Sequence, residues 1–83
     1  MVIDARNLSF DETFKELRDV VSHGQAGLDE VSVFVDAHDC EKLNLITGFA
    51  KILLECNTIV IEANGYYILK VVQDPDARAN KNN

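Results

Sequence analysis

Asp4-Ala5-Arg6-Asn7-Leu8-Ser9-Phe10-Asp11-Glu12 is the stretch in which a first strand ends and a first helix begins. Val2 to Arg6 reads as a short strand. Ser9 and Glu12 have capping-box spacing, in which the serine hydroxyl accepts the backbone N–H of Glu12 and the glutamate reaches back to that of Ser9. Behind the cap, apolar residues recur at intervals of four, three and four, as on one stripe of a helix: Phe10, Phe14, Leu17 and Val21.

A buried strand and a second helix are predicted downstream. Residues 25–30 read as a loop after Gly24, whose tolerance of positive φ suits the end of a helix. Val31 to Val35 is rich in β-branched and aromatic residues, and Phe34 breaks the alternation, so we expect a central strand covered on both faces. Asp36 or Asp39 then caps a helix. The expected buried side of that helix consists of Leu43, Ile46, Phe49, Ala50 and Leu53.

Gly48 lies inside this second helix, where glycine costs about 1 kcal/mol relative to alanine, and it therefore indicates a close packing contact. Two further strands follow, from Thr58 to Ala63 and from Tyr66 to Val72. Asn64-Gly65 joins them, and because both residues tolerate positive φ we expect a type I′ turn. Such a hairpin makes the last two strands antiparallel.

The predicted order is β-α-β-α-β-β, an α/β chain that forms a two-layer α+β sandwich. A strand–helix–strand unit pairs its strands in parallel, so the four-stranded sheet is mixed. The two helices each have one apolar stripe, which is enough to cover one face of the sheet and leaves the other face at least partly open. We expect one domain over residues 1–72 and a disordered, polar tail over residues 73–83.

Composition limits the classes of function. The 83 residues are enough for a single small domain, and the net charge of −6 repels phosphate backbones, so nucleic acid is not expected as a partner. No signal peptide or membrane-spanning apolar run is visible, and a membrane role is not expected. Two cysteines are too few for a disulfide framework and fit a reducing compartment, so we expect a cytoplasmic protein.

The chain resembles the TusA/SirA/YedF family of small sulfur-carrier proteins between about Val2 and Val72. The resemblance rests on four pieces in the family's order and spacing. These pieces are Asp4-Ala5-Arg6-Asn7-Leu8, Val33-Phe34-Val35-Asp36, Phe49-Ala50 and Gly65-Tyr66-Tyr67-Ile68. The family usually has glycine where this chain has Asn7.

The resemblance implies a cysteine-proline-x-proline motif at the start of the first helix, where the family's cysteine carries a persulfide sulfur. A helix N-terminus favours a thiolate there. In this chain those positions hold Phe10, Asp11 and Thr13, so no catalytic residue is carried over. Arg18 stands where the family often has a lysine. Phe10 is interpreted as a packing residue that closes the first helix onto the sheet.

Two thiols remain as candidates for a relocated function. Cys40 falls in the first turn of the second helix and is expected to be a buried structural cysteine. Cys56 precedes the third strand and is expected to be the more exposed of the two. Asp36 to Glu41 offers several ligand atoms, but zinc needs three or four Cys or His ligands at defined spacing, so neither a metal nor a cofactor is predicted.

Three functional hypotheses follow. The first is a non-catalytic interaction module linked to sulfur relay, which docks on a relay protein or a desulfurase through a surface formed by Asn7, Asp11, Glu12, Thr13 and Arg18. The second is a sulfur or selenium carrier that uses Cys40 or Cys56. The third is a regulatory domain unrelated to sulfur. The open sheet face is a natural site for a partner or for a homodimer.

Overall fold

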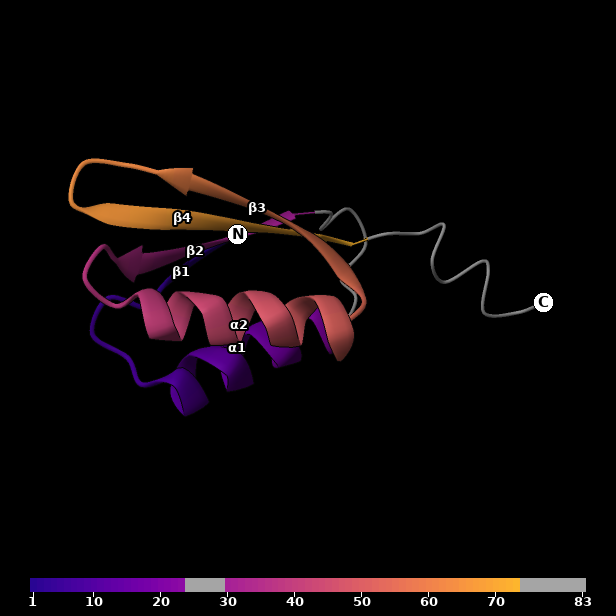
Figure 1. Cartoon of the computed structure of the whole chain (residues 1–83). Coiled ribbons are helices and arrows are strands. Elements are labelled where there is room, and N and C mark those ends of the chain that lie inside the picture. The colour runs from indigo at the N-terminus through magenta and orange to yellow at the C-terminus, as the bar shows by residue number, and fades with distance from the viewer. Residues whose placement is uncertain (24–29, 74–83) are drawn as a thin grey trace.

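The computed structural model describes residues 1–23 and 30–73 and has the predicted order of elements (Figure 1). These elements are β1 (Val2–Asp4), α1 (Phe10–His23), β2 (Glu30–Asp36), α2 (Cys40–Ile52), β3 (Cys56–Glu62) and β4 (Tyr66–Gln73). The first strand ends at Asp4, two residues before the predicted end. The predictions for Gly24 and for the tail beyond Gln73 lie outside the described residues.

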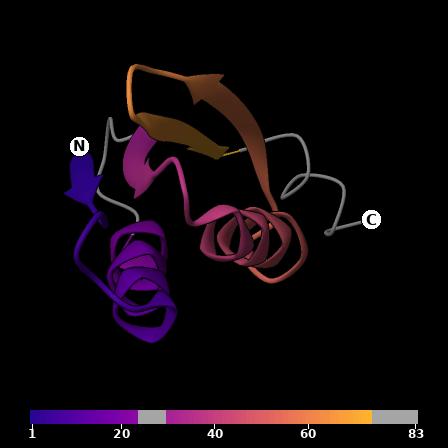
Figure 2. The same cartoon turned by 60° about the vertical axis from the view of Figure 1, so that its left-hand side comes forward.

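The sheet is mixed, as predicted, with the strand order β1-β2-β4-β3. β1 and β2 are parallel, and β4 is antiparallel to both β2 and β3. β2 is therefore central, but the expectation that it is covered on both faces is wrong. Both helices lie on one face of the sheet (Figure 2). On the other face, Phe34 is half-buried by the ring of Tyr66, 5.5 Å away between centroids, and by the guanidinium of Arg6.

The core lies between the sheet and the two helices. Alternate residues of β2 and β4 point into it, which is the period-2 pattern of a strand with one covered face. Its largest fully buried side chains are Leu17, Ile46, Leu69, Val33, Val35, Val71 and Thr13.

α1 begins as the capping box predicts. The backbone N–H of Ser9 donates to the Glu12 carboxylate at 3.1 Å, and the N–H of Glu12 donates to the Ser9 hydroxyl at 3.2 Å. These two bonds lower the pKa of Glu12. Thr13 is fully buried, and its hydroxyl donates to the Ser9 carbonyl at 2.8 Å, so a residue read as polar surface belongs to the core.

α2 begins at Asp39, one of the two predicted caps, whose carboxylate accepts the N–H of Lys42 at 3.2 Å. Its buried side differs from the prediction. Leu43, Ile46 and Ala50 are buried, but Phe49 and Leu53 are 38% and 58% exposed, and Lys42 is buried instead. The close contact predicted at Gly48 is also wrong, because a Cβ built there meets nothing within 4 Å.

The last hairpin forms at the predicted position with a different turn. Gly65 has φ +89°, but Asn64 does not have positive φ, whereas a type I′ turn needs it at both residues. Glycine at the second central position is the requirement of a type II turn.

None of the helices in the described part of the chain has the length and apolar character that crossing a membrane requires.

Candidate functional site

Both helices begin at the same end of the molecule, next to the ends of β1 and β2 (Figure 1). Between their first turns lies a hollow of about 320 Å³. We call it the N-terminal hollow. It is lined by Leu8, Ser9, Phe10, Asp39, Glu41, Lys42 and Leu45. It contains Phe10, the residue that the resemblance aligns with a sulfur-carrying cysteine.

Lys42 fixes the shape of this hollow. Its amino group donates to the backbone carbonyls of Ala5 at 2.7 Å and Leu8 at 2.8 Å, and lies 3.6 Å from the Asp39 carboxylate. It therefore ties the connection between β1 and α1 to the first turn of α2. Sequence reasoning missed this residue. The available signal was a lone lysine on the apolar stripe of α2, four residues before Ile46.

Phe10 packs in an aromatic cluster between the two helices. Its ring centroid lies 5.8 Å from that of Phe14 and 5.4 Å from that of Phe49, and the rings of Phe14 and Phe49 are 5.5 Å apart. Such offset and tilted pairs are favourable beyond their burial. This geometry fits the interpretation of Phe10 as a packing residue.

Acidic residues belong to both of the first turns that form the N-terminal hollow. Asp39 and Glu41 line it, and Asp11 and Glu12 follow Phe10 in the first turn of α1; we call Asp11, Glu12 and Glu41 the acidic rim. Asp11, Glu12 and Glu41 are exposed in the first turns of the two helices, and Asn7 is exposed in the connection before them. Carboxylates at helix N-termini are stabilised by the helix dipole, so their presence is also ordinary helix chemistry.

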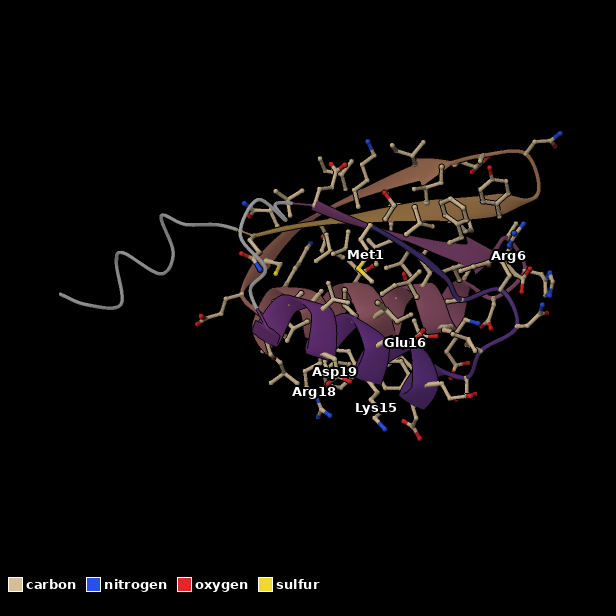
Figure 3. The ribbon with its side chains drawn as sticks, turned by 180° about the vertical axis from the view of Figure 1, so that it is seen from behind. Met1, Arg6, Lys15, Glu16, Arg18 and Asp19 are labelled. Carbon is tan, nitrogen blue, oxygen red and sulfur yellow. The ribbon has the colours of Figure 1, made fainter. Side chains whose placement is uncertain are left out.

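Two of the predicted docking residues do not belong to this rim. Thr13 is buried, as described above, and offers no surface to a partner. Arg18 is exposed, but it follows Asp11 by seven residues, or about 10 Å along the helix axis. Figure 3 shows Lys15 and Arg18 pointing from α1 toward solvent.

Arg6 and Asp4 form a charged pair next to the open face of the sheet. The Arg6 guanidinium donates to both Asp4 carboxylate oxygens, at 2.9 and 2.8 Å, which lowers the pKa of Asp4 to about 2. The same guanidinium lies 5.4 Å from the centre of the Tyr66 ring, a cation–π distance. Arg6 therefore covers part of the aromatic surface that the helices leave open.

The two cysteines have the opposite exposure to that predicted. Cys40 is exposed in the first turn of α2, and its Sγ lies 3.7 Å from the Ala37 carbonyl and 4.0 Å from the Tyr67 hydroxyl. The hydrogen bond and the charge of Cys40 raise the pKa of Tyr67. Cys56 is buried in the core, and its Sγ donates to the Leu54 carbonyl at 3.4 Å.

Cys40 is not among the residues that line the N-terminal hollow, because it contacts β4 instead. The described residues also contain no group of three or more His, Cys, Asp or Glu side chains that could hold a metal ion.

A second hollow, of about 480 Å³, lies between β1 and α1. Figure 3 looks onto this side, where Met1 lies across from Glu16 and Asp19 of α1. Its lining combines apolar side chains, such as Ile3 and Val20, with carboxylates.

Comparisons of the chain with models of protein families, with characterised proteins and with solved structures identify no match. The relation to the sulfur-carrier family thus stays a prediction from the four sequence pieces that resemble it.

Proposed function

We propose that this chain is a non-catalytic protein-interaction module, linked to sulfur relay, that docks through the N-terminal hollow and its acidic rim. The observation that carries the proposal is the replacement at Phe10. By resemblance, this position holds the sulfur-carrying cysteine, and here it holds an aromatic residue packed against Phe14 and Phe49. Such a site keeps a shaped surface and has no nucleophile at that position.

The hollow has the composition of a docking site. Leu8, Phe10 and Leu45 give it apolar walls, and Asp39 and Glu41 line it as well, while Asp11 follows Phe10 in the first turn of α1. The buried Lys42 holds its walls together before any partner arrives. A preformed apolar depression with charges around it favours a partner segment that has one apolar side chain flanked by lysine or arginine.

A relocated thiol is the second candidate, and the exposure of Cys40 favours it over Cys56. Cys40 lies exposed in the first turn of α2, and its sequence neighbours Asp39 and Glu41 are acidic. A persulfide on Cys40 would lie on the β4 side of α2, next to Tyr67, and not in the N-terminal hollow. The two candidates therefore use different surfaces.

Intact mass separates these two candidates. The reduced protein is incubated with a cysteine desulfurase and cysteine, and then weighed. We expect no mass gain, while a family member that has its cysteine gains one sulfur under the same conditions. A gain that disappears in Cys40→Ser would replace the docking proposal with a carrier function.

Docking itself is tested by affinity for the desulfurase and for that family member, measured by calorimetry. Reversing two rim charges, Asp11→Lys with Glu41→Lys, is expected to weaken binding at least tenfold, because like charges then face a basic partner. Glu12 is left unchanged because it caps α1.

The matched control is Glu16→Lys, which changes the charge of α1 away from the N-terminal hollow and should leave the affinity within about twofold. Circular dichroism checks that each variant is folded. If neither probe protein binds the wild-type chain, the link to sulfur relay is wrong. If the double variant Asp11→Lys with Glu41→Lys binds as well as the wild type, the docking surface is wrong.

A further inference from the structure

β3 forms one edge of the sheet and has none of the features that usually protect an edge strand. The order β1-β2-β4-β3 leaves its outer side without a partner strand among the described residues (Figure 2). It has seven residues, with no proline and no lysine, and its one charge, Glu62, is at its end. Unpaired N–H and C=O groups along such an edge are a template for another strand.

The opposite edge is protected in the usual way. β1 has only three residues, and Asp4 within it is ion-paired with Arg6 at 2.8 Å. Short edge strands and charged edge residues both discourage pairing with another chain. The β1 edge is therefore protected against pairing with another strand, whereas the β3 edge is not.

The hydrogen bonds of the final hairpin determine which backbone groups of β3 point outward. The N–H of Ala63 donates to the Tyr66 carbonyl at 2.8 Å, which makes these residues a hydrogen-bonded pair. Such pairs alternate along an antiparallel ladder, so Ile61 and Ile59 also bond to β4. The N–H and C=O groups that point away from β4 are those of Thr58, Val60 and Glu62.

Three consecutive large side chains line the same edge. Ile59, Val60 and Ile61 are between 40% and 55% exposed. Val60 is opposite the buried Leu69 and so lies on the helix-covered face, whereas Ile59 and Ile61 lie on the open face. An occupant must offer backbone hydrogen-bonding groups together with apolar side chains on both faces, and an apolar β-strand has both.

The sequence of β3 complements itself in an antiparallel register centred on Val60. Val60 then lies opposite Val60 of the second copy, and Ile59 lies opposite Ile61, so each exposed apolar residue meets another. Glu62 lies opposite Thr58, so no two carboxylates face each other. The pairs Val60–Val60 and Thr58–Glu62 are formed by the residues whose backbone groups point away from β4, so the register is also correct for hydrogen bonding.

The distribution of charge favours this edge for contact between two copies. The chain has a net charge of −6, and many of its exposed carboxylates belong to β1 and α1: Asp4, Asp11, Glu12, Glu16 and Asp19. Near β3 there are two lysines, Lys51 of α2 and Lys70 of β4, beside the carboxylates Glu55 and Glu62, and Lys70 is ion-paired with Glu30 of β2 at 3.8 Å. Two negatively charged copies therefore meet with the least repulsion along β3.

The chain's own C-terminal residues match this edge poorly. They follow Gln73, which pairs with Cys56 at the beginning of β3. Residues 74–83 contain no Val, Ile, Leu, Met or aromatic residue. They have no side chains to cover Ile59, Val60 and Ile61, whereas β3 of another copy has them.

We propose that β3 pairs with β3 of a second copy of this chain, in an antiparallel register centred on Val60, and that the two sheets join into one. The interface differs from the open sheet face, which the sequence alone indicated for a homodimer. The proposal is independent of the proposed function, because the N-terminal hollow lies on other elements.

Sedimentation velocity across micromolar to millimolar concentrations tests the dimer. The wild-type chain is expected to reach twice its mass of 9.3 kDa. Val60→Lys is expected to stay monomeric, since it places two ammonium groups opposite each other. The matched control is Val2→Lys, an exposed valine on the opposite edge strand, which should dimerise as the wild type does. Circular dichroism establishes that both variants are folded.

Amide hydrogen exchange tests the register. In dilute solution, the amides of Ile59 and Ile61 should be protected by β4, whereas those of Thr58, Val60 and Glu62 exchange rapidly. At concentrations where the dimer forms, the second group should gain at least tenfold protection, and the alternation along β3 should disappear.

Three results would overturn the proposal. A wild-type chain that stays monomeric at millimolar concentration has no such interface. A dimer that persists in Val60→Lys uses another surface. Irregular species larger than a dimer mean that the edge is only a site of aggregation.

Discussion

The amino group of Lys42 connects three parts of the chain that are distant in sequence. It bonds the carbonyls of Ala5 and Leu8 and lies beside Asp39, while the side chain as a whole is only 7% exposed. A buried ammonium is tolerated here because backbone oxygens and a carboxylate replace its water. The walls of the N-terminal hollow therefore depend on one residue.

Replacing this residue should destabilise the fold. Lys42→Met keeps the volume of the side chain but leaves the Leu8 carbonyl without its donor, and we expect a loss of about 1–3 kcal/mol in the free energy of unfolding. Urea denaturation measures this loss. Lys51→Met, at an exposed position of the same helix, should change stability by less than about 0.5 kcal/mol. Equal losses of stability in the two variants would contradict the view that the hydrogen bonds of Lys42 stabilise the fold.

The pair formed by Asp4 and Arg6 should make stability depend on pH. The pKa of Asp4 is about 2 in the folded chain and has an ordinary value of 3.8. A carboxyl whose pKa is lowered by folding binds more protons when unfolded, so its stabilisation is complete above pH 3.8 and is lost as the pH falls toward 2.

The difference in urea midpoint between wild type and Asp4→Asn isolates this contribution. It should be constant at neutral pH and should fall steeply as the pH drops from 3.8 toward 2. High salt should reduce it, because both side chains are at the surface. A difference that does not change with pH would mean that the ion pair is not formed in solution.

At the scale of the elements, local signals decide where the helices begin and long-range packing decides which side is buried. The capping box formed by Ser9 and Glu12 was predicted correctly because all of its partners lie within three residues. The burial of Phe49 and Leu53 was predicted wrongly, because it depends on how much of α2 the sheet and α1 cover.

At Gly48, too, the helix was predicted correctly from local signals, while the predicted packing contact was wrong. Nothing lies within 4 Å of a Cβ at this position, so Gly48→Ala should raise stability by up to about 1 kcal/mol through better helix propensity. Thermal denaturation should show a rise of several degrees. The matched control is Gly65→Ala, which should destabilise the hairpin because φ is +89° there. A destabilised Gly48→Ala would reveal a contact that the structure does not show.

At the scale of the whole molecule, the two layers separate the surfaces by character. The helices begin together at one end and surround the N-terminal hollow, while the apolar edge of β3 lies on the side away from β1. The many carboxylates of β1 and α1 are distant from that edge. The proposed docking surface and the proposed self-association surface therefore lie on different elements of the molecule.

The sequence by itself determined the order of elements, the mixed sheet, the cap of α1 and the position of the hairpin. Each of these follows from periodicity, capping or turn residues, which act between neighbours in the chain. Phe10, Asp11 and Glu12 could likewise be named as residues of the candidate site, because the start of a helix is a local feature.

Only the tertiary structure decided which side chains those elements bury. It placed Cys56 in the core and Cys40 at the surface, buried Thr13 and Lys42, and left Ile59, Val60 and Ile61 exposed at an edge. The physical reason is that burial depends on contacts between residues far apart in the chain. The strand order is the clearest case, because β4 lies between β2 and β3 and leaves β3 at the edge.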